Sequence, residues 1–151
     1  MLDFLHTSPV IWKNAGQIGL TYLLTLLIGW EREQEAHGTG LRTFPLVGMA
    51  SCGFLLTLGA NHDSGDQSRV LQGLITGIGF IGGGAILKDG ATVRGTATAA
   101  SVWNAGVIGA AVAMEQYAVA IILALLNLVT LRALLPLKYR IDQRSKADPR
   151  E

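Results

Sequence analysis

The chain has 151 residues, of which half are apolar and 15% are charged, and its formal net charge is +1. A nearly neutral chain without a basic stripe excludes a nucleic-acid-binding protein, and the single cysteine, Cys52, excludes a disulfide framework or a zinc site built on several cysteines. The long apolar runs indicate a membrane protein, because about 20 helical residues cross the hydrocarbon core of a bilayer.

Five apolar segments follow one another along the chain and predict five membrane-spanning helices. They cover about residues 12–30, 44–60, 70–87, 95–114 and 117–135. The joints between them are short, so neighbouring helices should be antiparallel, with a tight turn near Glu115–Gln116. The predicted fold is an all-α integral membrane protein, a five-helix bundle over residues 1–137, followed by a charged cytoplasmic tail, 138–151, that should fray.

The basic residues predict the orientation of this bundle. If the N-terminus lies outside, ten of the twelve basic residues lie on the inner side and only Lys13 and Arg69 lie on the outer side. This asymmetry fits the positive-inside rule and predicts an N-out, C-in protein. The first residues lack a basic stretch, so we expect no cleavable signal peptide.

Charged residues gather where the first span ends and where later segments return to the same side. They are Glu31, Arg32, Glu33, Arg42, Lys88 and Arg94. Charges near a membrane are costly unless they pair or face water. Two interpretations stay open: interfacial anchoring, or a functional cluster on the cytoplasmic side in which Glu31, nearest the apolar run, is the leading residue.

The joint before the third segment carries His62, Asp63 and Asp66. Two carboxylates in a loop make only a weak magnesium site. Asp66, with Arg69 one turn later, is explained more simply as the start of the third helix.

The third segment contains GIGFIGGG, residues 77–84, which matches the G-x-G-x-x-G fingerprint of dinucleotide-binding loops. No strand pattern precedes it and no acidic residue follows at the required distance, so this reading is rejected. The alternative is close helix packing through small residues. On a helix, one side would carry Gly73, Gly77 and Gly84. The opposite side would carry Gly79, Gly82 and Gly83.

A helix with two glycine faces should be held from two sides, which predicts that the third helix is the central one. The glycines also weaken helicity. A local break at residues 82–84 that lines a cavity therefore stays open as an alternative.

The fourth segment carries a stripe of small residues, the expected surface against the third helix: Gly95, Ala99, Gly106, Ala110 and Ala113. Beside this stripe lie Thr98, Ser101 and Asn104, at three-residue spacing. Their side chains either bond to neighbouring carbonyls or form the mid-membrane polar lining of a site or path, with Asn104 as its deepest member. The sequence has no nucleophile–base pair and no His/Cys metal spacing, so it predicts neither an enzyme nor a cofactor.

Several motifs together resemble the membrane domain of the MgtC/SapB family, over about residues 16–135. They are LIGWERE (27–33), GLRT (40–43), SRV (68–70), GIGFIGGGAIL (77–87), VRGTATAASVW (93–103) and IG (108–109). The residues carried over from these motifs are Glu31, Arg32, Glu33, Arg42, Arg69, Gly77, Gly79, Gly82, Arg94 and Trp103. Three places differ from the common family pattern: Phe44 replaces His, Gln67 replaces Pro, and GTATAA (95–100) replaces GLTTAA.

The resemblance implies a multi-pass protein of the bacterial inner membrane, linked to growth under magnesium limitation. It implies a regulator that contacts other membrane proteins, including the F-type ATP synthase, and magnesium would then be sensed rather than held. Some members append a soluble C-terminal domain, for which we expect no room here. The competing hypothesis is a small magnesium or proton transporter or channel that acts as a homo-oligomer, most simply a dimer.

Overall fold

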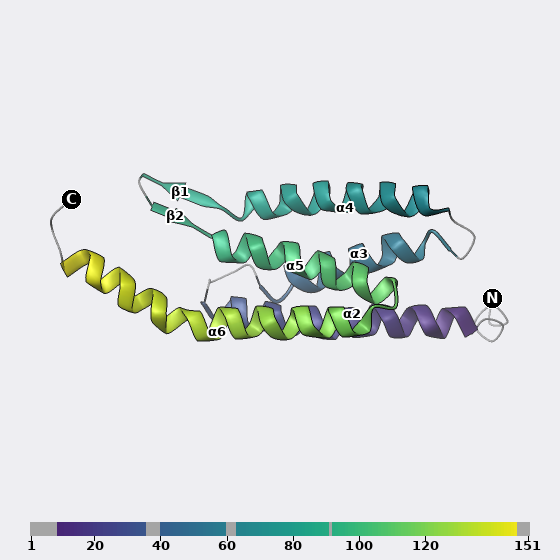
Figure 1. The fold of residues 1–151 in the computed structure, drawn as a ribbon, viewed down its shortest axis with the longest axis horizontal. Coiled ribbons are helices and arrows are strands. Elements are labelled where there is room, and N and C mark those ends of the chain that lie inside the picture. The colour runs from purple at the N-terminus through teal and green to yellow at the C-terminus, as the bar shows by residue number, and fades with distance from the viewer. Residues whose placement is uncertain (1–8, 36–39, 60–62, 91, 148–151) are drawn as a thin grey trace.

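The computed structural model describes residues 9–35, 40–59, 63–90 and 92–147, as five helices and one β-hairpin (Figure 1). The elements in chain order are α2 (Pro9–Glu35), α3 (Thr43–Leu56), α4 (Ser64–Gly84), β1 (Leu87–Asp89), β2 (Thr92–Arg94), α5 (Thr96–Ala113) and α6 (Tyr117–Ala147). The helices run along the long axis of the molecule and consecutive helices are antiparallel. The all-helical prediction is confirmed.

Figure 1 places α4 at one edge of the bundle and α2 and α6 at the other, with α5 between them. Helix α5 contacts α2, α3, α4 and α6. The prediction that the third helix is central was therefore wrong, because α4 buries only Ile78 and Gly82 among its described residues. Glycines permit a close approach but bring no side chain to bury, so two glycine faces do not by themselves make a central helix.

Close backbone-to-backbone packing between helices involves Gly48 and Gly109, which lie outside the glycine faces and the small-residue stripe that the sequence predicts. A Cβ atom at Gly109 on α5 would collide with the carbonyl oxygen of Gly48 on α3. A Cβ atom at Gly48 would lie 2.7 Å from Cγ2 of Thr25 on α2. Helices α2, α3 and α5 therefore meet where small residues let their backbones approach.

The predicted contact between the small-residue stripe of α5 and α4 is present. A Cβ atom at Gly82 would lie 3.3 Å from the carbonyl oxygen of Ala99, and Ile78 packs directly onto Gly106. The stripe thus places α4 against one side of α5.

Helix α5 ends in a tight turn, at the predicted place. The N–H of Gln116 donates to the carbonyl of Ala111 (2.8 Å), and that of Glu115 donates to Val112 (3.0 Å). These are the two bonds of a Schellman motif. Glu115 takes the left-handed conformation at its centre, with φ of 60°, and its carboxylate pairs with Lys13 at 2.6 Å.

Where the sequence predicts a joint at residues 88–94, strands β1 and β2 form an antiparallel hairpin, in which Leu87 pairs with Arg94 and Asp89 with Thr92. Gly95 follows with φ of 84°, and a Cβ atom there would collide with the carbonyl oxygen of Ala85. A glycine is therefore required between the hairpin and α5. We call this end of the bundle the hairpin end, and the opposite end, with the α5–α6 turn, the turn end.

The helix boundaries differ from the predicted spans: α2 covers Pro9–Glu35 rather than about 12–30, and α4 ends at Gly84 rather than near residue 87. Helix α3 ends at Leu56 rather than near residue 60, and α4 already begins at Ser64. Helix α6 continues past Pro136 to Ala147, so most of the tail expected to fray is helical. Figure 1 shows this last part of α6 bending away from the bundle, next to a proline that removes a helical hydrogen bond.

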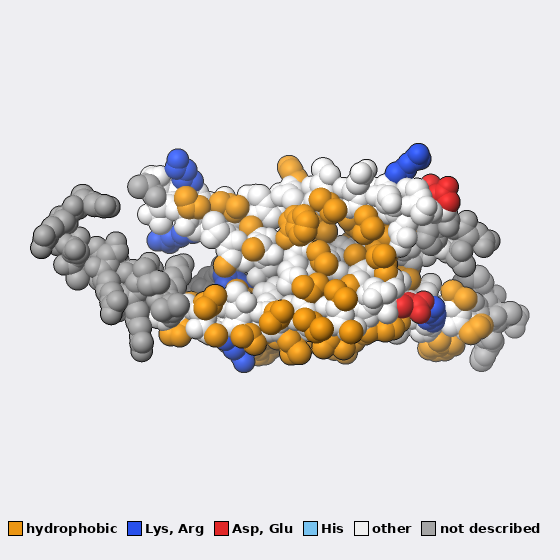
Figure 2. Space-filling model, in the orientation of Figure 1, with side chains coloured by type: hydrophobic (Ala, Val, Ile, Leu, Met, Phe, Trp, Pro, Cys, Tyr) orange, Lys and Arg blue, Asp and Glu red, His pale blue; other side chains and the backbone are white. Residues whose placement is uncertain are grey.

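Apolar side chains cover much of the outer flank of the bundle, and charged side chains lie towards its two ends (Figure 2). Two stretches are long and apolar enough to cross a membrane by length and composition: Thr96–Ala113 and Tyr117–Pro136. Helix α2 has polar Thr21 and Thr25 fully buried, whereas Leu23 and Leu27 are more than half exposed. This inside-out arrangement suits a helix whose outer face meets lipid.

Candidate functional site

Glu31 and Arg132 form an ion pair at the hairpin end that joins α2 to α6. One carboxylate oxygen of Glu31 accepts from Nε of Arg132 at 2.8 Å and from Nη2 at 2.7 Å. The Glu31 side chain is 10% exposed and that of Arg132 is 69% exposed. A nearly buried carboxylate is thus held by a cation that faces outward. The sequence singled out Glu31 but counted Arg132 only as a topology signal.

Arg32 points in another direction and joins α2 to α5. Its guanidinium is buried, and Nη2 donates to the hydroxyl of Thr98 at 3.0 Å. Thr98 lies in the first turn of α5, so this member of the predicted polar lining belongs to the charged end rather than to the middle of the bundle.

Glu33 binds the backbone of the segment that leads into α3. Its carboxylate accepts from the backbone N–H groups of Gly40 (2.8 Å) and Leu41 (3.2 Å). A Cβ atom at Gly29 would lie only 2.7 Å from the carbonyl oxygen of Gly40. The motifs LIGWERE and GLRT therefore fit together physically, and Glu33 has a structural role in that contact.

The two remaining members of the predicted polar lining bond to α6. Ser101 donates to Oδ1 of Asn127 at 3.0 Å, and both side chains are buried. Asn104 donates to the carbonyl of Leu123 at 3.3 Å. Sequence reasoning missed Asn127, although a lone amide within an apolar run was a usable signal.

A second row of polar side chains, also missed, lies on the inner face of α2. Gln17 donates through Nε2 to the carbonyl of Val112 at 2.9 Å. Thr21 and Thr25 donate to carbonyls four residues earlier in their own helix, at 2.9 and 2.7 Å. Their four-residue spacing in an apolar run was the signal. Ile28, fully buried, comes one turn later and separates this row from Arg32.

A cavity of about 580 Å³ opens at the hairpin end between α2, β2, α5 and α6. Its polar wall brings together Arg32 and Arg94 from the predicted cluster. The lining residues are Arg32, Gln34, Val93, Arg94, Gly95, Thr96, Ala97, Thr130, Leu131, Leu134 and Leu135.

Other predicted site residues lie apart from this cavity. Arg42 and Lys88 are exposed at the same end but do not line it. Asp66 and Arg69 are exposed at the turn end, where Asp63 caps α4 by accepting from the N–H of Asp66 at 2.8 Å. His62 lies outside the described residues. Across the described ranges, no three His, Cys, Asp or Glu side chains come close enough to hold a metal ion.

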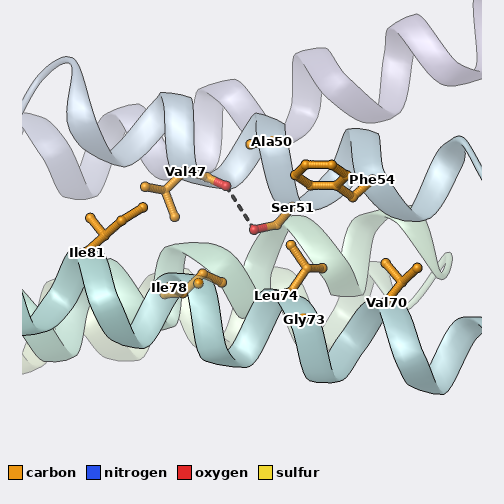
Figure 3. Close-up of a pocket in the computed structure, with 10 residues that line it drawn as sticks. Val47, Ala50, Ser51, Phe54, Val70, Gly73, Leu74, Ile78 and Ile81 are labelled. Carbon is orange, nitrogen blue, oxygen red and sulfur yellow. Dashed lines mark hydrogen bonds between the residues drawn. The ribbon is translucent and has the colours of Figure 1, made fainter.

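The glycine faces of α4 are mostly open. Of the six glycines singled out, Gly82 packs on α5, and a Cβ atom at Gly79 would lie 4.0 Å from Nε1 of Trp103. At the other four, a Cβ atom would meet nothing within 4 Å: Gly73, Gly77, Gly83 and Gly84. Gly73 and Gly77 line an apolar groove of about 470 Å³ between α3 and α4 (Figure 3). The helix runs unbroken through Gly84 and ends there, so the alternative of a break within the helix was wrong.

Comparisons with known proteins agree on one family. The sequence profile of the MgtC family matches residues 18–140. The putative magnesium transporter YhiD of Escherichia coli (strain K12) is 34% identical over 122 residues, which cover 76% of this chain and 57% of that protein. Protein MgtC of Brucella abortus (strain 2308) is 35% identical over 104 residues, covering 66% and 44%. Protein MgtC of Salmonella typhimurium is 38% identical over 96 residues, covering 63% and 41%.

The chain thus spans about half the length of these curated relatives. No solved structure matches it.

Proposed function

Because this chain belongs to the MgtC family, we propose that it is a regulatory protein of the bacterial inner membrane, linked to magnesium homeostasis. In this proposal it crosses the membrane five times, with the hairpin end in the cytoplasm, and acts through contacts with other membrane proteins. The F-type ATP synthase, implied by the family resemblance, is the first partner to test. The protein is not an enzyme in this proposal, and it works as a homo-oligomer, most simply a dimer.

The observation that carries the proposal is the separation of the polar groups inside the bundle. A conductor needs a continuous hydrated lining. Along α2, however, the row from Gln17 to Thr25 is followed by fully buried Ile28 before Arg32 is reached. The two threonines of the row are themselves fully buried and donate to their own helix.

The charged side chains at the hairpin end offer what a regulator needs. Arg42, Lys88, Arg94 and Arg132 are exposed there, and Glu31 holds Arg132 in place. Exposed charges in a fixed arrangement favour specific contacts with a partner of complementary charge. Loss of the Glu31 charge should therefore disturb this surface more than a change in the middle of the bundle.

A second candidate function is a small magnesium or proton transporter that acts as an oligomer. Two observations favour it: one relative is named a putative magnesium transporter, and polar side chains lie buried along α2 and α5. Flux in proteoliposomes that contain only this protein separates the candidates. Saturable magnesium or proton flux would overturn the regulatory proposal.

Variants test the regulatory proposal in a bacterial strain that lacks its own MgtC-type protein and grows poorly in low magnesium. We expect Glu31→Gln to abolish complementation in a well-expressed protein, because it removes the buried charge and keeps the shape. Asn104→Leu should weaken complementation only partly, since one interhelical hydrogen bond in lipid contributes about 0.6–2 kcal/mol.

Glu115→Gln is the matched control, since Glu115 pairs with Lys13 at the turn end and its loss should leave complementation intact. Full complementation by Glu31→Gln, together with complete loss in a folded Asn104→Leu variant, would instead favour the transporter.

A further inference from the structure

We propose that the cavity at the hairpin end binds the phosphate group of an anionic phospholipid. The proposal rests on the membrane-spanning arrangement above, which places this end of the bundle at a membrane interface. It assigns a ligand to a site that the family comparisons leave without one.

The charge of the cavity wall favours an anion. Arg32 enters it from α2 and Arg94 from β2, and none of its lining residues within the described chain carries a carboxylate. Arg32 is only 8% exposed, so its charge acts in a partly desolvated setting, where it is screened less than at an open surface. Guanidinium groups suit phosphate because their planar donor forks match its oxygen atoms.

The backbone at this wall adds to the same preference. Gly95, Thr96 and Ala97 line the cavity, and α5 begins at Thr96 without a side-chain cap. The first N–H groups of a helix have no acceptor within the helix and carry its positive dipole end. They reinforce the two arginines as donors to an oxyanion.

The cavity also has an apolar lining, which distinguishes a lipid from a free anion. Leu131, Leu134 and Leu135 of α6 line it, together with Val93 of the hairpin. Leu134 is 54% exposed, so this lining continues onto the outer flank of the bundle. A ligand with a phosphate head and acyl chains would find both donors and leucines in the lining of this cavity.

The level of the cavity along the bundle fits the position of lipid headgroups in a membrane. Trp30, 56% exposed, lies two residues before Arg32 on α2, which is about 3 Å along the helix axis. Exposed tryptophans prefer the membrane–water interface, and basic pockets between membrane helices near that level are typical sites for anionic headgroups.

The test measures the melting temperature of the detergent-solubilised protein as phosphatidylglycerol is added. Phosphatidylcholine and inorganic phosphate serve as the two comparison ligands. We expect a saturable rise with phosphatidylglycerol, a much smaller one with phosphatidylcholine and none with phosphate at matched concentration. Equal effects of the two lipids would overturn the anion site, and an equal effect of phosphate would overturn the lipid.

Arg94→Gln is the informative variant because Arg94 is exposed at the edge of the cavity. It should raise the phosphatidylglycerol concentration that gives half the effect by about tenfold, as expected for a charge-assisted hydrogen bond. Lys88→Gln is the matched control, since it removes one positive charge from the same hairpin without touching the cavity. A loss of equal size in Lys88→Gln, or an unchanged response in Arg94→Gln, would overturn the proposal.

Arg94→Lys keeps the charge but removes the planar fork and should lie between wild type and Arg94→Gln. If Arg94→Gln proves unstable, Arg94→Lys still tests whether the guanidinium group of Arg94 binds the lipid. A response in Arg94→Lys identical to that of wild type would then contradict recognition by the guanidinium.

Discussion

At the scale of single residues, the Glu31–Arg132 and Lys13–Glu115 ion pairs differ in how far they are exposed to solvent. The Glu31 side chain is nearly buried beside an exposed Arg132, whereas both members of the Lys13–Glu115 pair are more than half exposed. An exposed pair contributes little because water screens it. A buried carboxylate that loses its partner is costly, because it keeps its charge without compensation.

The first prediction is therefore that replacing Arg132 lowers the free energy of unfolding more than replacing Glu31 does. Arg132→Leu leaves the Glu31 charge without that partner and should lower the free energy of unfolding by about 1–3 kcal/mol. Glu31→Gln leaves an amide oxygen that still accepts from Arg132, and its cost should be smaller. Unfolding in detergent measures both, with Lys13→Leu as a control that stays within about 1 kcal/mol. A larger loss in Lys13→Leu than in Arg132→Leu would contradict this account.

Sequence reasoning at this scale found polar residues more readily than their partners. Thr98, Ser101 and Asn104 were singled out as polar residues in an apolar segment, and each bonds to another helix. Asn127 and Arg132 were not singled out, because the residues around them in the sequence do not indicate which side chains on other helices they contact. Pairing across a bundle depends on the rotation of each helix, which the sequence leaves open.

At the scale of helices, small residues decide which backbones touch. Gly109 lies against the backbone of Gly48, whereas Gly83 faces open space. Both occur in helices rich in small residues, so composition alone cannot separate them. The helical spacing of α4 predicts two glycine faces, but which face has a neighbour depends on where α3 and α5 lie.

The second prediction compares alanine at these two positions. Gly109→Ala should reduce the free energy of unfolding by about 1–3 kcal/mol, the usual cost of overpacking, because the carbonyl of Gly48 cannot move without shifting α3. Gly83→Ala should match or exceed wild-type stability, since alanine favours the helix and meets nothing. Thermal unfolding of the purified proteins gives both values. Equal stability of the two variants would refute the assignment of the close contact.

At the scale of the whole molecule, five antiparallel helices were predicted from five apolar runs and short joints, and the described chain has that order. The prediction succeeded because the number and order of the helices follow from the hydropathy and length of each sequence segment by itself. The hairpin at residues 87–94 was missed because it has only three residues in each strand. The central place of α5 was missed because it depends on packing among all the helices.

The third prediction concerns the orientation of the bundle. Of the eleven basic residues in the described ranges, nine lie towards the hairpin end, on α2, just before α3, on the hairpin and on α6, and the turn end carries Lys13 and Arg69. The hairpin end should therefore face the cytoplasm. With Cys52 first replaced by alanine, Ser64→Cys should react with an impermeant thiol reagent in intact cells. Ser145→Cys should react only after the membrane is opened. The reverse pattern would contradict the five-span arrangement and its orientation.

The inside-out face of α2 has a consequence for how the protein is made. In the five-span arrangement α2 enters the membrane first, yet the amide of Gln17 donates to a carbonyl that lies 95 residues further along the chain. Among the described helices, α5 and α6 are long and apolar enough to cross a membrane by length and composition, whereas α2 and α4 are not. The early helices are thus the marginal ones, and the helix that shelters their polar atoms is synthesised after them. In the five-span arrangement we therefore expect the later helices to retain the earlier ones in the bilayer during biogenesis.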